Sequence, residues 1–272
     1  MTGFQNLHTH TTFCDGALSP EEVINAALKK GCRSIGFSEH SYVSFDKYSM
    51  TLEGTSEYVC EVNRLKGKYE GSIEVFLGIE QDYYSGKPPD GLDYILGTTH
   101  YIRSENWDSH ICIDNGAGLQ MHAAERYFGG DYYAMAECYF DVMSDLINKT
   151  SADIVGHFDL IAKYNIGGRL FDETHPRYIG AALRSMEAIL EGCKVFEVNT
   201  GAMYRLGNPE PYPSVLLLKE LLKRGGEVIL SSDSHDEDSL FFKFDEMQEL
   251  LKSCGYRYLK RLTRTGFIDV KL

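Results

Sequence analysis

The sequence alternates short β-rich runs with segments of helical periodicity, and the alternation continues to the end of the 272-residue chain. This pattern is typical of repeated β/α units that build a parallel sheet. About seven runs have this character, and no low-complexity segment interrupts them. The length suits one large barrel or two modest domains, and no linker favours two.

Strands are expected in seven stretches, residues 4–8, 34–40, 73–84, 94–102, 153–159, 194–200 and 227–235. The clearest helix follows the first of them, because Ser19, Pro20 and Glu22 form a capping box with proline at the first helical position. Later helices are expected around residues 57–69, 132–148, 176–190, 214–224 and 239–253, and a short β-like tail ends the chain.

The connection from Arg103 to Gly130 breaks the regular alternation. Connections of this length in compact domains are usually lids or binding loops. It contains Trp107, His110 and His122. We therefore expect residues 103–130 to form a long active-site loop.

Composition limits the classes of function. The chain has 27 Lys and Arg against 40 Asp and Glu, a formal net charge of −13. This excess of acid argues against a duplex nucleic-acid footprint, which needs a basic stripe. An anionic substrate would need local cations to overcome the overall field.

Location is inferred from what the sequence lacks. The longest apolar runs are too short for a membrane span, so no membrane partner is expected. The N-terminus shows no signal-peptide pattern, which predicts a cytoplasmic protein. The seven cysteines are scattered without a CxxC pair. They are expected to be reduced, mostly buried thiols, with no thiolate zinc site.

Potential metal ligands follow the ends of six expected strands, in "NLHTH", "FSEH", "LGIE", "GTTH", "VGHFD" and "SSDSH". In a closed parallel barrel the C-terminal strand ends converge on one rim, where active sites are built. Because side chains alternate along a strand, a single spacer residue sends both histidines of "HTH" to the same side. The residues expected to converge are His8, His10, His40, Glu80, His100, His157, Asp233 and His235.

Each of these residues also has an ordinary structural interpretation. A lone strand-end histidine is most often a hydrogen-bonded loop residue, Asp233 suits a helix N-cap, and Glu80 suits a buried ion pair. The joint occurrence of these residues favours a metal site, because only His110, His122 and His175 of the nine histidines lie away from expected strand ends. A single tetrahedral ion takes about four ligands. The candidate ligands are more numerous than that, so two or three divalent ions are expected. Imidazole with carboxylate favours zinc, iron or manganese without choosing among them.

The set "HTHTTFCDG", "SEH", "GIE", "TTH", "GHFD" and "SDSH", in this order on successive strands, resembles the polymerase and histidinol phosphatase (PHP) superfamily. The match runs from Phe4 to about Asp236. Within that superfamily, "FEVNTGAMYR" followed by "EPYPS" is similar to the free-standing histidinol-phosphate phosphatases. The resemblance implies a single domain over residues 1–272, a distorted (β/α)7 TIM-like barrel with a trinuclear metal site at the C-terminal rim of its strands.

The resemblance also implies a division of the ligands among three divalent ions. Glu80 is expected to bridge two of them, because a carboxylate can bind two cations through its two oxygens. The first ion would be held by His8, His10, Glu80 and Asp233, the second by Glu80, His100 and His157, and the third by Asp15, His40 and His235.

The implied reaction is hydrolysis of L-histidinol phosphate to L-histidinol and phosphate, late in histidine biosynthesis. A hydroxide shared by two metals would attack phosphorus in line. Glu80, Asp233 and His235 are the expected catalytic residues, with His235 or a metal-bound water protonating the leaving group. Metal binding makes Asp233 a poorer acid.

Phosphate binding is expected from Arg205, Lys163 and His40. Arg205 matches a phosphate-binding arginine of the family and could donate two hydrogen bonds. Lys163 occupies a position where relatives often carry arginine. A compact ammonium group would therefore replace a planar guanidinium group that can donate two parallel hydrogen bonds. Arg169 is a weaker candidate. The histidinol end of the substrate would contact Trp107 or a loop carboxylate, Asp108 or Asp114.

Two other functions stay open. One is a PHP phosphoesterase acting on nucleotides or another small phosphomonoester. The other is a non-catalytic metal-binding module. The presence of a suitable residue at all nine expected ligand positions argues against it.

Overall fold

Seven parallel strands form the centre of the molecule in the computed structural model, which describes residues 3–103, 107 and 109–272. Their spatial order is β1-β2-β3-β4-β7-β8-β9. The bounds are β1 (Gln5–Asn6), β2 (Ser34–Phe37), β3 (Glu74–Asp82), β4 (Tyr94–Thr98), β7 (Ile154–Val155), β8 (Val195–Asn199) and β9 (Glu227–Ser231).

The two edges of this sheet meet beyond the ends of β1 and β9. Thr9 and Ser234 form a parallel β-bridge. The His10 amide donates to the Ser234 carbonyl at 2.8 Å, and the Ser234 amide donates to the His8 carbonyl at 3.1 Å. The result is a nearly closed barrel, which confirms the expected distorted (β/α)7 architecture.

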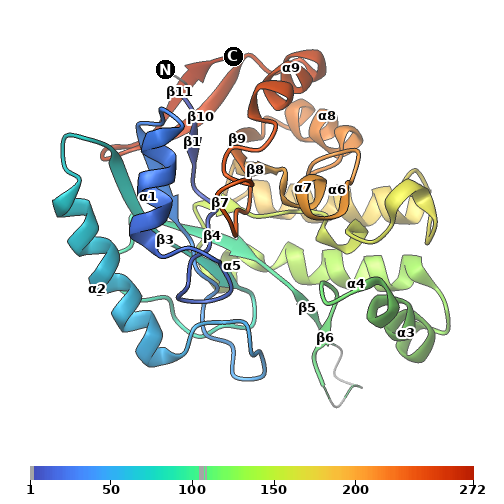
Figure 1. The fold of residues 1–272 in the computed structure, drawn as a ribbon. Helices are drawn as coiled ribbons and strands as arrows, with labels where there is room; N and C mark the ends of the chain where they lie inside the picture. Colours follow the sequence, from blue (N-terminus) through green and yellow to red (C-terminus); the bar gives the residue numbers. More distant parts are fainter. Residues whose placement is uncertain (1–2, 104–106, 108) are drawn as a thin grey trace.

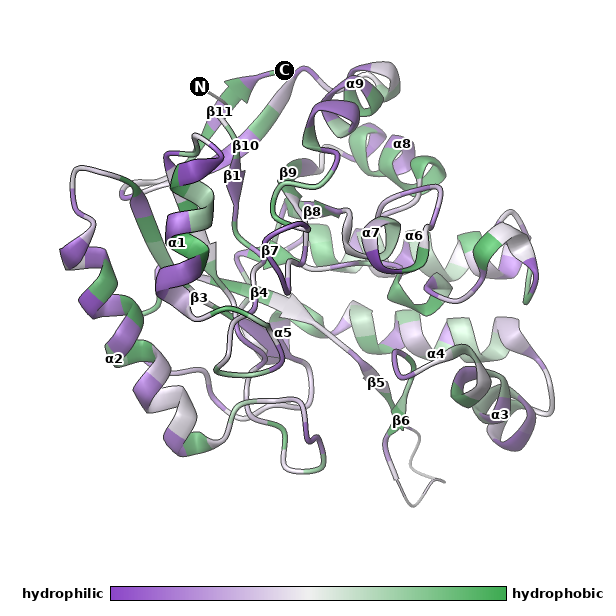
Figure 2. Ribbon diagram, viewed as in Figure 1, coloured by the Kyte–Doolittle hydropathy of each residue, from purple (hydrophilic) through white to green (hydrophobic). Residues whose placement is uncertain are grey.

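Helices surround the barrel and turn their apolar faces toward it (Figure 2). The first begins as predicted, with both hydrogen bonds of the Ser19 and Glu22 capping box present. Pro176 likewise starts α6 at its first turn. The bounds are α1 (Pro20–Lys29), α2 (Leu52–Lys68), α4 (Tyr132–Ser144), α5 (Leu146–Thr150), α6 (Pro176–Leu190), α7 (Gly201–Leu206), α8 (Val215–Lys223) and α9 (Phe244–Cys254).

Several predicted boundaries were wrong, and α2, expected from residue 57, already begins at Leu52. The helix expected over residues 132–148 divides into α4 and α5 at Asp145, whose φ and ψ of −97° and 3° are not helical. The last helix begins at Phe244 because Phe241 and Lys243 have left-handed backbone conformations, with φ of 63° and 55°. The strand expected over residues 94–102 ends at Thr98.

Much of the described part of residues 103–130 is regular secondary structure, and β5 (Tyr101–Ile102) lies just before it. This strand pairs antiparallel with β6 (Ile111–Cys112), and α3 (Ala117–Phe128) follows. The expected long loop was therefore wrong for its second half. Gln120, Ala123 and Ala124 are buried and are spaced as on one face of a helix. The polar residues around them make this pattern hard to recognise in the sequence.

The C-terminal tail is an antiparallel hairpin of β10 (Tyr258–Thr263) and β11 (Gly266–Lys271). It packs at the end of the barrel where the chain termini lie close together (Figure 1). Gln5 fixes it there, because its side chain donates to the Leu262 carbonyl at 3.0 Å and accepts from the Leu262 amide at 2.8 Å. The hairpin lies at the end opposite the strand C-termini.

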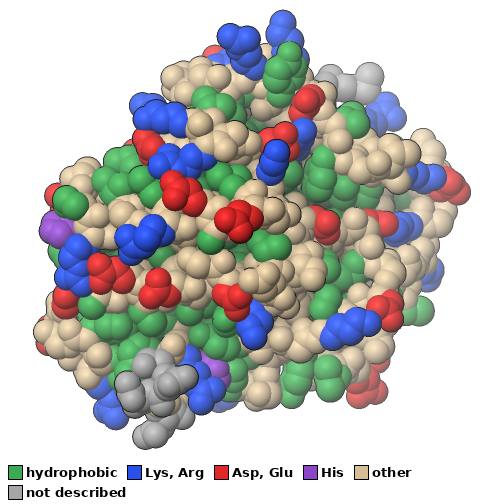
Figure 3. Space-filling view, turned by 180° about the vertical axis from the view of Figure 1, so that it is seen from behind, with side chains coloured by type: hydrophobic (Ala, Val, Ile, Leu, Met, Phe, Trp, Pro, Cys, Tyr) green, Lys and Arg blue, Asp and Glu red, His purple; other side chains and the backbone are tan. Residues whose placement is uncertain are grey.

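All seven cysteines are free, but only Cys32 and Cys193 are buried, so the expectation of mostly buried thiols was wrong. Acidic and basic side chains are interspersed among the described residues on the face that Figure 3 shows. None of the described helices is both long and apolar enough to cross a bilayer.

Close packing in the barrel interior leads to a prediction about stability. A Cβ on Gly78 of β3 would lie 2.2 Å from the Tyr94 ring, whose hydroxyl donates to the Phe37 carbonyl. Gly78→Ala should therefore lower the free energy of unfolding by about 1–3 kcal/mol, measured by urea denaturation. The matched control is Gly67→Ala in α2, where nothing lies within 4 Å of the added Cβ and a gain of about 0.5–1 kcal/mol is expected. Equal stabilities of the two variants would contradict this packing argument.

Candidate metal centre

A pocket of about 920 Å³ opens at the C-terminal ends of the barrel strands. His8 and His10 lie beneath it and are almost fully buried. The structure thus brings the residues predicted from the sequence to one place. Those that line the pocket are Asp15, His40, Glu80, His100, His157, Lys163, Arg205, Asp233 and His235.

Glu80 lies at the centre of this cluster and is 1% exposed. Its Oε2 lies 2.7 Å from His40 Nδ1 and 3.5 Å from His8 Nε2. Its Oε1 lies 2.9 Å from His157 Nε2 and 3.4 Å from His100 Nε2. The two oxygens therefore face different imidazoles, as a bridging carboxylate would.

Asp233 and Asp15 extend the cluster on either side. Asp233 Oδ1 lies 3.3 Å from His10 Nε2 and 3.6 Å from His8 Nε2. Asp15 Oδ1 lies 3.2 Å from His235 Nε2 and 3.6 Å from His40 Nε2. The candidate ligand atoms form overlapping groups within 4.8 Å, including His8, His10 and Asp233; His8, Glu80 and His157; His40, Glu80 and His100; and His10, Asp15, His40 and His235.

These groups differ from the predicted division in more than one respect. His40, assigned to the third ion, also groups with Glu80 and His100, and His8, assigned to the first ion, groups with Glu80 and His157. His10 was assigned to the first ion alone, yet it also lies near Asp15, His40 and His235. Its ring stacks between those of His40 and His235, with centroid distances of 4.4 and 4.3 Å. His10 is therefore placed between the first and third predicted sites.

Local backbone geometry explains how residues 8–15 contribute side chains to both the first and the third predicted metal sites. Thr9 turns away from the two histidines, and its hydroxyl donates to the Gly36 carbonyl at 2.6 Å. The following turn returns Asp15 toward His10 because Gly16 packs directly on the backbone there. A Cβ at Gly16 would lie 2.4 Å from the His10 carbonyl oxygen, so the turn requires glycine.

Sequence reasoning missed Glu197, a fully buried carboxylate behind the cluster. It lies 2.8 Å from His8 Nδ1 and accepts hydrogen bonds from the His157 amide at 2.6 Å and the Ser231 hydroxyl at 2.5 Å. A carboxylate there orients the imidazole and directs its other nitrogen into the site. The available signal was an acidic residue inside the apolar run "VFEVN".

Two further carboxylates have similar supporting positions. Asp82 lies 3.2 Å from His100 Nδ1 and accepts from the His100 amide at 2.9 Å. Glu39, fully buried, accepts from the Thr11 hydroxyl at 2.5 Å and the Cys14 thiol at 2.6 Å. Cys14 is thus a hydrogen-bond donor beside the site as well as a packing residue.

The donor set fits divalent cations. Among the described residues, buried His8 Nε2 and His10 Nε2 have no hydrogen-bond partner. Buried polar atoms without partners are costly and rare, so such a group calls for an additional binding species. Imidazole nitrogen with carboxylate oxygen suits zinc, manganese or iron.

Electrostatics in the cluster favour a negative Glu80. Burial alone would raise the pKa of Glu80, but the charges of His40, His100 and His8 outweigh it and hold that pKa well below its usual value. Burial likewise opposes ionisation of Asp233, and Arg205 overrides it to lower the Asp233 pKa. Both carboxylates are therefore ionised and ready to bind cations.

The histidines respond in opposite directions. Burial would lower the pKa of His8, but Glu197, Asp233 and Glu80 raise it well above the usual value. By contrast, burial together with the imidazoles of His235 and His40 lowers the pKa of His10 to about 3. In the metal-free protein, protons therefore occupy part of the space that cations would fill.

Two predicted phosphate-binding cations border the pocket. Arg205, on α7, donates from Nη2 to Asp233 Oδ2 and from Nη1 to the Asp233 carbonyl, both at 2.7 Å. Lys163 forms an ion pair with Asp114. Arg169 is not part of the pocket lining, and its Nε donates to the Tyr164 carbonyl at 3.3 Å.

The residues expected to contact the histidinol end have different positions. Trp107 packs against Tyr127 and Phe128 of the α3 end, and it is not among the residues that line the pocket. Asp108 lies outside the described residues. Asp114 and His110 do line the pocket, with the His110 ring 3.9 Å from that of Phe45.

Comparison with known proteins agrees with this geometry. The family model of the PHP domain matches residues 6–201, well over half of the chain. The chain belongs to the PHP domain family.

Individual relatives match nearly the whole chain. A protein of Deinococcus radiodurans named "probable histidinol-phosphatase" is 28% identical over 94% of this chain and 96% of its own length. Histidinol-phosphatase of Bacillus subtilis is 23% identical over 89% of this chain and 97% of its own. Both matches are nearly full-length.

A solved structure of histidinol phosphate phosphatase from Lactococcus lactis, in complex with zinc, L-histidinol and phosphate, has the same PHP fold. Its TM-score is 0.68 and its sequence identity 18%, with 97% of this chain and 98% of the other covered. Asp233 and His235 lie beyond the matched part of the PHP family model, so the geometry of β9 is what places them in the cluster.

The supporting role of Glu197 can be tested apart from catalysis. Glu197→Gln removes the negative charge beside His8 Nδ1 but keeps the shape of the side chain. It should weaken binding of Mn²⁺ by about 10–100-fold, measured by competition with a chelator. Glu187→Gln, on the exposed face of α6, is the control for loss of one negative charge and should bind Mn²⁺ as the unmodified chain does. Equal affinities for the two variants would show that Glu197 does not orient the ligand.

Metal affinity should also depend on pH. Because the pKa values of His8 and His40 are raised, cations must displace protons from them at neutral pH. The apparent affinity for Mn²⁺ should therefore increase by about tenfold or more per pH unit from pH 6 to 8. Equilibrium titration at several pH values measures this slope. An affinity that levels off at pH 6.5 would mean that these imidazoles are already unprotonated.

Proposed function

We propose that this PHP domain is a metal-dependent phosphomonoesterase that hydrolyses L-histidinol phosphate to L-histidinol and phosphate. The observation that carries the proposal is the combination, in one pocket, of an imidazole and carboxylate cluster with Arg205 and Lys163. The curated relatives named histidinol-phosphatase and the Lactococcus lactis complex support the choice of substrate.

The cluster is proposed to hold three divalent ions, with zinc, manganese and iron as candidates. Overlap of the ligand groups around Glu80 supports a bridging role for its carboxylate. His8, His10, Glu80 and Asp233 would hold the first ion, Glu80, His100 and His157 the second, and Asp15, His40 and His235 the third.

The ions would supply Lewis acidity and a water nucleophile of lowered pKa. The residues of the chain bind and orient the substrate around that chemistry. Arg205 would donate N–H groups to phosphate oxygens, Lys163 would do so on release from its ion pair with Asp114, and His40 borders the same space. Arg205 is already positioned by Asp233, so its guanidinium loses little freedom on binding phosphate.

Either His235 or a metal-bound water would protonate the leaving oxygen, and His235 could do so only while it is not holding the third ion. His235 lines the pocket and is 23% exposed, so its imidazole is accessible to substrate. Its Nδ1 lies 3.0 Å from the Asp233 carbonyl oxygen and 3.1 Å from Arg205 Nη1. Glu80 and Asp233, held ionised, act by binding cations and not as acids.

The histidinol end is proposed to occupy the part of the pocket lined by Ser109, His110, Cys112, Asp114, Asn115 and the loop of Phe45. Asp114 offers a carboxylate, and the stacked rings of Phe45 and His110 offer an apolar wall. The whole chain is proposed to act as one domain in the cytoplasm, at a late step of histidine biosynthesis.

A phosphate-release assay over a panel of esters tests the substrate. With Mn²⁺ or Zn²⁺ supplied, the kcat/KM for L-histidinol phosphate should exceed that for 3′,5′-nucleotides at least tenfold. Faster release from nucleotides would replace this proposal with a PHP phosphoesterase of other specificity. No release from any ester by a metal-loaded chain would indicate a binding module.

The planar fork of Arg205 makes a sharper prediction. Arg205→Lys keeps the positive charge but loses one of two parallel hydrogen bonds to phosphate. The KM for L-histidinol phosphate should increase about tenfold, an effect of roughly 1.4 kcal/mol, while the metal content stays unchanged. Arg224→Lys, whose partners Glu187 and Glu220 lie on the outer helices, is the matched control. An unchanged KM in Arg205→Lys would exclude Arg205 from phosphate binding.

A further inference from the structure

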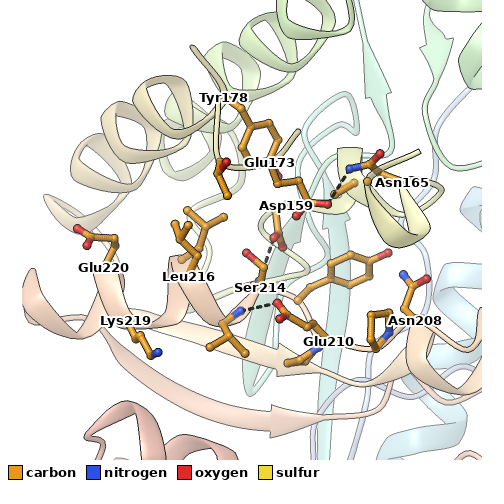
Figure 4. Close-up of a pocket in the computed structure, with 18 of the residues that line it drawn as sticks. Asp159, Asn165, Glu173, Tyr178, Asn208, Glu210, Ser214, Leu216, Lys219 and Glu220 are labelled. Atoms are coloured by element: carbon orange, nitrogen blue, oxygen red, sulfur yellow. Dashed lines mark hydrogen bonds between the residues drawn. The ribbon is translucent and has the colours of Figure 1, made fainter. Parts of the chain in front are cut away.

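A second cavity, of about 600 Å³, lies beside the metal pocket between α6 and α8. Among the described residues, none lines both cavities. Figure 4 shows Asp159 near its centre, between Glu173 on one side and Ser214 on the other. Its mouth is bordered by the exposed residues Gly167 and Gly168.

Several buried polar atoms in this cavity have no partner. Asp159 Oδ1, the Tyr178 hydroxyl and the Tyr212 hydroxyl lack hydrogen bonds among the described residues, although these side chains are only 1%, 1% and 5% exposed. Asn208 Oδ1 is a fourth such atom. Each unsatisfied buried group costs about 1–3 kcal/mol, so four lining one cavity indicate a missing binding species.

The cavity also holds three carboxyl groups at successive depths, and burial raises the pKa of Asp159 to about 7 and that of Glu173 above its usual value. Asp159 is buried, Glu173 is half-buried and Glu210 is exposed at the mouth. Each accepts one hydrogen bond, respectively from the Ser214 amide at 2.9 Å, the Asn165 side chain at 2.8 Å and the Val215 amide at 2.9 Å (Figure 4). No ion pair joins these three carboxylates to a described lysine, arginine or histidine.

The lysines of the lining do not neutralise these carboxylates. Lys223 pairs with Glu220 at 2.6 Å on the outer face of α8. Figure 4 places Lys219 and Glu220 on the helix side of the cavity, apart from Asp159 and Glu173. A positively charged group from outside the chain would therefore be complementary to the interior.

An organic cation fits this cavity better than a metal ion. Asp159, Glu173 and Glu210 do not form a group of ligand atoms within 4.8 Å of one another, as the residues of the metal pocket do. Apolar side chains form much of the remaining wall, beside Thr174, Lys219, Glu220 and Lys223; they are Ile166, Pro209, Pro211, Val215, Leu216 and Leu217. An ammonium group on an apolar body would satisfy both kinds of wall.

We propose that this cavity is a separate binding site for a small organic cation, with the ammonium group at Asp159 and Glu173 and the apolar part against α8. Two chain segments connect it to the metal pocket. Asp159 follows His157 by two residues, and the Asn208 side chain donates to the Lys163 carbonyl at 3.3 Å. The site itself does not depend on the phosphatase proposal.

Binding of 2-phenylethylamine, with neutral 2-phenylethanol for comparison, tests the inference. Isothermal titration uses the metal-loaded full chain, with inorganic phosphate present at the metal pocket. The amine should bind with a Kd below about 1 mM and at least tenfold tighter than the alcohol. Equal binding of the two compounds, or no binding of the amine, would overturn the proposal.

Variants locate the bound amine. Glu173→Gln should weaken amine binding at least tenfold, and Asp159→Asn provides a second variant if the first does not fold. Glu191→Gln, an equal charge change at the exposed end of α6, should leave the affinity unchanged. Unchanged affinity in a folded Glu173→Gln or Asp159→Asn variant would place the amine elsewhere and overturn the proposal.

Discussion

The structure depends on one buried carboxylate, Glu80, surrounded by imidazoles. A buried negative charge is costly unless positive groups approach it closely, and both oxygens of Glu80 have imidazoles near them. Removing one partner of such a group leaves an uncompensated buried charge. The rim of the barrel is therefore built around Glu80, and divalent cations are the species that best complete the arrangement.

The barrel supplies the rigidity that this cluster needs. Hydrogen bonds of His8 and His10 with Ser234 close the sheet, so ligands from opposite ends of the sequence become neighbours. Glu197 then fixes the His8 ring from behind. The same interactions that close the barrel also aim the ligands, which ties the stability of the fold to the geometry of the site.

Much of this could be predicted because strong local signals coincided with topology. Strand alternation placed His8 and His10 on one side, and the convergence of parallel strand ends brought Glu80 to them. Glu197 was missed because a single acidic residue in an apolar run has no periodic signal. The helix α3 was missed because tertiary packing, more than its own pattern, buries Ala123 and Ala124. Exact helix ends depended on backbone conformations, such as that of Lys243, which periodicity does not encode.

Metal content of the intact chain tests the central role of Glu80 most directly. The unmodified protein and Glu80→Gln would be loaded with Mn²⁺, dialysed and measured by inductively coupled plasma mass spectrometry on folded samples. The account predicts more than one ion per unmodified chain and loss of at least half of the bound metal in Glu80→Gln. Equal metal content in the two proteins would contradict it.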